Sequence, residues 1–131
     1  MKQEDKELLL KDLCSRLPYG VVVKLDEKFG FNKGTRPLVK ELLDLYCVEG
    51  MKPYLRPMSS MTEEERKEYE GFIIHREHVN AQGQEWDIDC FSFDGVPRLI
   101  DWLNAHHFDY RGLIEKGLAI AVTKENNPYK S

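Results

Sequence analysis

The chain contains four histidines, which could bind a metal ion or act in catalysis. His75 and His78 stand three residues apart, and His106 and His107 are adjacent. The first two with one of the second pair would supply three nitrogen ligands and leave a fourth metal position open, as in catalytic zinc sites. The glutamate and the spacing of a zinc-protease helix motif are absent from the sequence. A metal-assisted hydrolase that uses these histidines is therefore the alternative hypothesis, and we expect no metal ion and no other cofactor.

Two further patterns are weaker candidates for catalysis. Asp87 and Asp89 could bind Mg²⁺, but acidic residues that alternate along a strand usually form its solvent-facing side. Cys90 could act as a nucleophile with a histidine as its base, but a cysteine in an apolar context is usually buried and inert. The sequence has no glycine-rich phosphate-binding loop. These patterns favour a protein that is not an enzyme, and we predict no catalytic residue.

Tyrosine and arginine side chains are the better candidates for binding. Tyr54 and Arg56 alternate with prolines in an extended segment, and polar residues gather after position 105. Tyrosine and arginine are enriched among the residues that dominate binding energy. A second interpretation is that Arg56 or Arg111 pairs with Asp109 or a glutamate and only fixes the loop, since polar groups in a corner need partners in any fold. The predicted binding residues are Tyr54, Arg56, His106, Asp109, Tyr110 and Arg111.

Residues 96–117 must position most of these groups. Apolar residues at helical spacing predict an α-helix that begins near Val96. After Phe108 the pattern restarts, because Asp109 can cap a short second helix and Gly117 can end it in the left-handed conformation. The segment is therefore predicted to form a helix, a corner and a second helix.

The side chains of this corner divide into two kinds. Trp102 and Phe108 are predicted to lie mainly in the core, because large aromatic rings bury much apolar area. Tyr110 and Arg111 fall in the first turn after the Asp109 cap, where side chains normally meet solvent. Tyr110 and Arg111 are therefore predicted to be exposed and to mark the partner surface.

The N-terminal part of the chain predicts a helix followed by strands. A helix is expected over residues 2–17, with Leu10, Leu13, Cys14 and Leu17 on its apolar face and with Lys11, Asp12, Ser15 and Arg16 toward water. Residues 19–25 predict a strand because consecutive valines favour extended backbone. Phe29 and Phe31 suggest a second short strand. Residues 38–48 fit either a helix or a strand, and we favour a strand for the second half.

The centre of the chain contains the best-defined helix start. Thr62 and Glu65 have the spacing of a capping box, in which each side chain binds the other residue's backbone N–H. A strand is expected to start near residues 72–74, followed by a loop over 80–84 and a half-buried strand over 85–93. Residues 118–122 predict a last strand. The fold class that follows is α+β: a single domain, 1–131, with an N-terminal helix, a small mostly antiparallel sheet and a C-terminal helix–corner–helix.

Composition limits the class of partner and the compartment. The net charge of −4 disfavours a broad nucleic-acid footprint, which needs a basic face. The apolar run of residues 8–10 is too short for a signal peptide or a membrane span. Three widely spaced cysteines, Cys14, Cys47 and Cys90, predict reduced and buried thiols rather than a disulfide framework. We therefore expect a cytoplasmic protein that binds an unidentified protein partner and no membrane, and the sequence leaves its oligomeric state open.

Three stretches of the sequence resemble a family of small proteins. They are LCSRLPYGV at residues 13–21, KPYLRPMSSMTEEE at 52–65 and WLNAHHFDYRGLIEKGLA at 102–119. They are similar to an uncharacterised family from gut bacteria of the Bacteroides group and from the phages and mobile elements of these bacteria. The resemblance covers about a third of the chain and implies no catalytic residue. It implies an accessory role, so our hypothesis is a non-enzymatic interaction or regulatory protein of a phage or mobile element.

Overall fold

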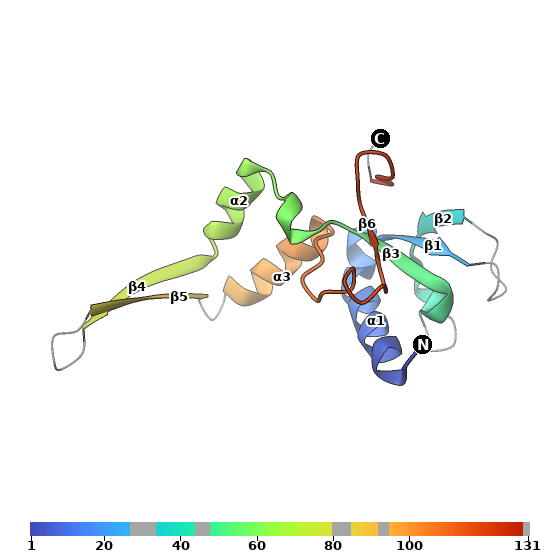
Figure 1. Cartoon of the computed structure of the whole chain (residues 1–131), viewed down its shortest axis with the longest axis horizontal. Helices are drawn as coiled ribbons and strands as arrows, with labels where there is room; N and C mark the ends of the chain where they lie inside the picture. Colours follow the sequence, from blue (N-terminus) through green and yellow to red (C-terminus); the bar gives the residue numbers. More distant parts are fainter. Residues whose placement is uncertain (27–33, 44–47, 80–84, 92–94, 130–131) are drawn as a thin grey trace. The chain divides into compact units, whose positions relative to one another are not determined.

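The computed structural model describes residues 1–26, 34–43, 48–79, 85–91 and 95–129 and has the predicted α+β class (Figure 1). The chain divides into two compact units. Unit 1 contains Met1–Ser60 and Leu103–Ser131, and unit 2 contains Met61–Trp102. No helix in the described part of the chain is long and apolar enough to cross a membrane.

Unit 1 begins with α1 (Gln3–Arg16), followed by a 3-10 turn over Leu17–Tyr19. Leu9 and Leu13 of α1 are buried in the core, and so are the polar residues Asp12 and Arg16. The predicted helix is confirmed, but its predicted apolar face is wrong by about one residue position. The buried face admits Asp12 and Arg16 because their opposite charges bind each other, at 2.8 Å from Arg16 Nε to Asp12 Oδ2.

The same rotation of α1 corrects the prediction for cysteine. Cys14 is a free thiol and lies exposed, because it is on the face of α1 opposite to the buried one. Cys47 lies outside the described residues, and Cys90 is placed in a strand by its backbone alone.

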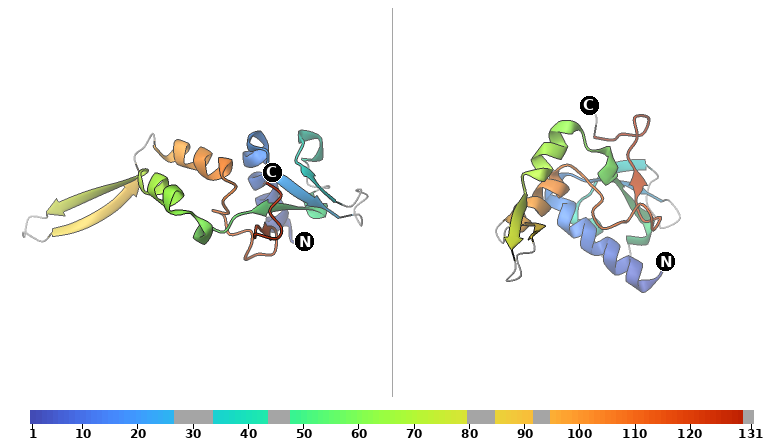
Figure 2. Two further views of the ribbon diagram at one scale, coloured as in Figure 1. Left: turned by 90° about the horizontal axis from the view of Figure 1, so that it is seen from above. Right: turned by 60° about the vertical axis from the view of Figure 1, so that its left-hand side comes forward.

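Unit 1 contains a four-stranded sheet in the order β2-β1-β3-β6. β1 (Val22–Leu25) is antiparallel to both β2 (Gly34–Pro37) and β3 (Met51–Leu55), whereas β6 (Ile120–Ala121) is parallel to β3. The sheet is therefore mostly antiparallel, as predicted. α1 lies against one face of it (Figure 2), and the core between them includes Leu9, Leu13, Val23, Leu25, Met51 and Leu55.

The remaining predictions for the first half of the chain have mixed outcomes. The predicted strand over 19–25 is shorter than expected, because Gly20 turns the chain with a φ of 71° before β1 begins. The region 38–48 contains 3-10 turns at Lys40–Leu42 and Val48–Gly50, and residues 44–47 lie outside the described part. The strand predicted at Phe29 and Phe31 also lies outside the described residues.

Unit 2 contains α2 (Glu63–Glu70), the hairpin strands β4 (Ile73–Val79) and β5 (Glu85–Phe91), and most of α3 (Gly95–Ala105). β4 and β5 pair antiparallel from Ile73↔Phe91 to Val79↔Glu85. Trp102 is half-buried rather than in the core, and its ring lies 6.3 Å from that of Tyr69 and 6.2 Å from that of Phe72. The last three residues of α3 belong to unit 1.

The capping box at the start of α2 is confirmed and gives a first prediction. Thr62 Oγ1 accepts a hydrogen bond from Glu65 N at 3.1 Å, and Glu65 Oε1 accepts one from Thr62 N at 2.9 Å. Thr62→Ala should lower the free energy of unfolding by about 1 kcal/mol, because one backbone N–H loses its acceptor. Urea unfolding monitored by helical circular dichroism measures the loss. Thr62→Ser is the matched control and should retain most of the stability; equal losses in the two variants would contradict the role of the hydroxyl.

The corner after α3 contains the same hydrogen-bond pattern twice, each time with one residue in the left-handed conformation. His107 has a φ of 62°, and the bonds from His107 N to Asn104 O and from Phe108 N to Leu103 O form a Schellman ending. The bonds from Gly117 N to Ile114 O and from Leu118 N to Leu113 O repeat this pattern with Gly117 at a φ of 74°. The left-handed Gly117 is thus confirmed.

The second helix of the predicted helix–corner–helix is wrong. Residues 113–117 form consecutive turns, although the Asp109 carboxylate accepts hydrogen bonds from Leu113 N at 2.9 Å and Ile114 N at 3.0 Å. The reason is the short distance between two left-handed glycines, since Gly112 has a φ of 75° and Gly117 one of 74°. Only four residues lie between these glycines, which is about one helical turn.

Candidate functional site

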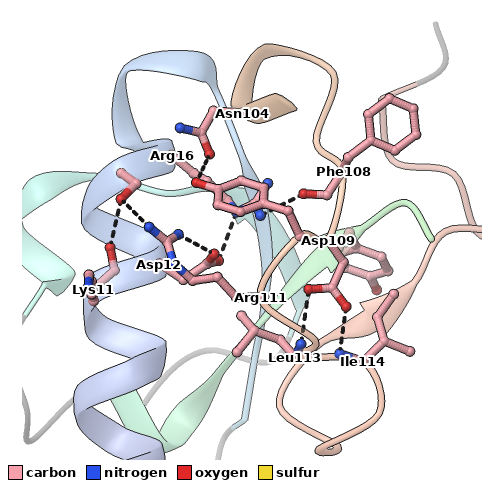
Figure 3. Close-up of polar contacts among 12 residues, drawn as sticks. Lys11, Asp12, Arg16, Asn104, Phe108, Asp109, Arg111, Leu113 and Ile114 are labelled. Atoms are coloured by element: carbon pink, nitrogen blue, oxygen red, sulfur yellow. Dashed lines mark hydrogen bonds and ion pairs between the residues drawn. The ribbon is translucent and has the colours of Figure 1, made fainter. Parts of the chain in front are cut away.

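A cluster of charged and aromatic side chains in unit 1 joins α1 to the corner after α3. We call it the arginine corner and define it as Asp12, Arg16, Asn104, Tyr110 and Arg111. Asp12 Oδ2 accepts from Arg16 Nε and Asp12 Oδ1 accepts from Arg111 Nη1, each at 2.8 Å (Figure 3). Asp12 and Arg16 are both 0% exposed. One buried carboxylate therefore binds two guanidinium groups that are far apart in the sequence.

Further contacts of the arginine corner also connect α1 with the residues that follow α3. Arg16 Nη2 donates to the Phe108 carbonyl at 2.7 Å, and Arg111 Nη2 donates to Ser15 Oγ at 3.3 Å. The Tyr110 ring has the Arg16 guanidinium 5.0 Å from its centre and that of Arg111 at 4.7 Å. These contacts hold α1 against the chain that follows α3.

Asn104 completes the arginine corner from the last turn of α3. It is 2% exposed, and its Oδ1 accepts a hydrogen bond from the Tyr110 hydroxyl at 2.8 Å. Arg16 Nη1 is the one side-chain nitrogen of the arginine corner that is buried without a hydrogen-bond partner among the described residues. The Asp12 carboxylate, the Tyr110 hydroxyl and the Asn104 amide oxygen are all bound by neighbouring side chains. The arginine corner therefore fixes α1 to the chain that follows α3.

Arg56 contacts the residues that follow α3 through both its backbone and its side chain. Its backbone N donates to His107 O at 2.7 Å and its carbonyl accepts from Asp109 N at 2.8 Å, so Arg56 and Phe108 form a parallel bridge. The Arg56 guanidinium lies 4.3 Å from the centre of the Phe108 ring. His106 stacks on the same ring at 6.2 Å. Phe108 is 0% exposed, as predicted.

His107 and Tyr129 form a second pair of rings beside the arginine corner. Their ring centres are 3.7 Å apart and the planes differ by 8°. Burial, together with the charges of Arg16, Arg56 and His106, lowers the pKa of His107 to about 4. Burial raises the pKa of Tyr129 to about 12. His107 is therefore neutral and Tyr129 protonated at pH 7, and His107 Nδ1 is buried without a hydrogen-bond partner among the described residues.

The structure brings the six predicted binding residues into unit 1, but it does not leave them free at a surface. Tyr54 is 8% exposed, and Asp109 caps the following turn. The predicted exposure of Tyr110 and Arg111 is wrong: both are half-buried, because they close over the Asp12–Arg16 pair. The pairing of an arginine that fixes the loop does occur, with Asp12 as the acid in place of Asp109 or a glutamate.

Four important residues of this region were absent from the predicted set. Asp12 and Arg16 carry a readable signal, since an acid four residues before an arginine is a helical ion-pair spacing. That spacing predicts the pair but not its burial. Asn104 and Tyr129 carry no comparable signal, because their partners lie far away in the sequence or on another element.

The histidines of the metal hypothesis fall in two units. His75 and His78 lie in β4, opposite Asp89 and Trp86, and positions three apart in a strand belong to opposite faces. His106 and His107 belong to unit 1. Among the side chains that the structure describes, no group of three or more histidine, cysteine or acidic residues is arranged to bind a metal ion.

Comparisons of this chain with protein-family models, with curated proteins and with solved structures find no match.

Proposed function

We propose that this protein is a non-enzymatic interaction protein whose acidic unit 2 binds a positively charged protein. The observation that carries the proposal is the division of charge between the two units. Unit 2 has eleven acidic and four basic residues, a net charge of −7, whereas unit 1 has twelve acidic and fifteen basic residues, a net charge of +3. A concentrated field of one sign favours a partner of the opposite sign and accelerates its association.

The first turn and the end of α2 supply exposed carboxylates for such a partner. Glu63, Glu64 and Glu70 are exposed, whereas the other two glutamates of this helix have structural contacts. Glu65 belongs to the capping box, and Glu68 Oε2 accepts from Trp102 Nε1 at 2.8 Å. The three exposed glutamates can therefore be changed without removing a described contact.

Unit 1 supports a non-enzymatic role. The Asp12 carboxylate is bound by Arg16 and Arg111, and the Tyr110 hydroxyl is bound to Asn104, so neither group is placed to act as a base or nucleophile. Three sequence stretches resemble small proteins of Bacteroides-group bacteria and their phages. This resemblance supports a protein that is encoded by a phage or mobile element and that has an accessory or regulatory role in the cytoplasm.

The test compares two variants with the same change in charge. Glu63, Glu64 and Glu70 are replaced together by glutamine in unit 2, and Glu4, Glu41 and Glu115, which are exposed in unit 1, are replaced together by glutamine as the control. The wild-type protein is used to capture a partner from cells of its source organism, and the affinity of the isolated partner is then measured for each protein. We expect the unit 2 variant to bind about tenfold more weakly and the control to bind like the wild type.

Two outcomes would overturn the proposal. Equal losses of affinity in both variants would mean that the total charge, and not unit 2, determines binding. An unchanged affinity of the unit 2 variant, at the same helix content as the wild type, would place the partner on another surface.

A further inference from the structure

The hydroxyl of Tyr129 lies between the two central strands of the sheet in unit 1. It accepts a hydrogen bond from Val22 N at 3.0 Å and donates one to Tyr54 O at 2.6 Å. The register of β1 and β3 pairs Val23 with Pro53 and Lys24 with Lys52, so its continuation places Val22 opposite Tyr54. In an antiparallel ladder this donor and this acceptor would bind each other directly. The phenol therefore replaces one rung of the ladder.

The ring of Tyr129 is recognised as specifically as its hydroxyl. His107 stacks on it at 3.7 Å with nearly parallel planes. His107 is itself fixed, because its N and O atoms bind Asn104 O and Arg56 N. One donor, one acceptor and one flat ring on a rigid backbone thus surround a phenol.

The rest of the C-terminal segment is held mainly to itself. Asn126 binds Thr123 N and Thr123 Oγ1 through its Oδ1, and its Nδ2 donates to Ala121 O at 3.1 Å. Tyr129 N donates to Asn127 Oδ1 at 2.9 Å. Among the described hydrogen bonds of residues 123–129, those of the Tyr129 hydroxyl alone reach β1 and β3. Within these described bonds, the segment is therefore attached to β1 and β3 through a single side chain, that of Tyr129.

We propose that Val22, Tyr54 and His107 form a phenol-binding socket, and that residues 123–129 occupy it as an exchangeable ligand within the chain. The class of ligand is a phenol, which in proteins is the side chain of tyrosine. A tethered ligand has a millimolar effective concentration, so the chain's own tyrosine fills the socket until a competing tyrosine or the loss of the segment exposes it.

The experiment uses the full-length chain with Tyr129→Ala and p-cresol as the probe. The substitution removes the phenol and leaves a cavity that p-cresol can fill. At millimolar p-cresol we expect the melting temperature of Tyr129→Ala to rise by about 5 °C, because a ligand that binds the folded state stabilises it. Toluene at the same concentration should raise the melting temperature less, since it has no hydroxyl for Val22 and Tyr54.

Tyr129→Phe is the matched control, because its ring fills the socket without the hydroxyl. p-Cresol should raise its melting temperature less than that of Tyr129→Ala, because it must displace the phenylalanine ring, but the Val22 amide should exchange its hydrogen about tenfold faster than in the wild type. This exchange measurement decides the question even if Tyr129→Ala does not fold. Equal effects of p-cresol and toluene on Tyr129→Ala, or an unchanged Val22 exchange rate in Tyr129→Phe, would overturn the proposal.

Discussion

Asp12→Ala should lower the free energy of unfolding by about 3–5 kcal/mol, the largest effect that we expect from one substitution. The variant leaves the Arg16 guanidinium buried at 0% exposure without its counter-ion. It also removes the acceptor of Arg111, so α1 loses the bond from this carboxylate to the corner after α3 together with its internal ion pair. Urea unfolding of the wild type and the variant measures the difference.

Lys11→Ala is the matched control for this prediction. Lys11 is the neighbouring residue in α1, and its side chain is exposed. Surface substitutions of this kind usually change stability by less than about 0.5 kcal/mol. If Asp12→Ala were as mild as Lys11→Ala, the buried ion pair would contribute nothing and the arginine corner would not hold α1 in place.

Acid should weaken the folded protein through His107. The pKa of this imidazole is about 4 in the folded state against an ordinary value of 6.5. Between pH 6.5 and pH 4, His107 is therefore protonated in the unfolded chain and still neutral in the folded chain. The contribution of His107 to the free energy of unfolding is fully present above pH 6.5. It decreases as the pH falls toward 4, by at most about 3 kcal/mol.

The control for this pH dependence is His107→Asn. Asparagine tolerates the left-handed backbone that His107 adopts at a φ of 62°, and it does not titrate. Unfolding free energies measured from pH 7 to pH 4 should therefore fall more steeply for the wild type than for His107→Asn. Parallel curves for the two proteins would show that His107 does not bind its proton differently in the two states.

Local signals in the sequence predict much of this fold. The capping box of α2, the strand propensity of the valines in β1 and the left-handed Gly117 each depend on residues within one or two turns of each other. The second helix of the corner could not be judged in this way. Asp109 and Gly117 have the residue types of a helix cap and a helix ending, but Gly112 adopts a left-handed φ of 75° between them. A local pattern does not reveal that the segment is too short for a helix.

The candidate site depends on contacts that no local pattern contains. Asp12 was predicted to face water because it is polar, and an isolated charge does avoid burial. It is buried because Arg111, 99 positions later, neutralises it together with Arg16. The predicted exposure of Tyr110 and Arg111 failed for the same reason. Tertiary pairing changes the preferred environment of both partners at once.

Partner affinity of Arg111→Ala, measured at equal concentrations of folded protein, tests the account most directly. In our proposal the arginine corner stabilises the fold and unit 2 binds the partner. Arg111→Ala should therefore unfold more easily, since Asp12 loses one of its two bound guanidinium groups, but it should bind the captured partner with wild-type affinity. Loss of affinity with unchanged stability would show that the corner is the binding surface and would contradict the account.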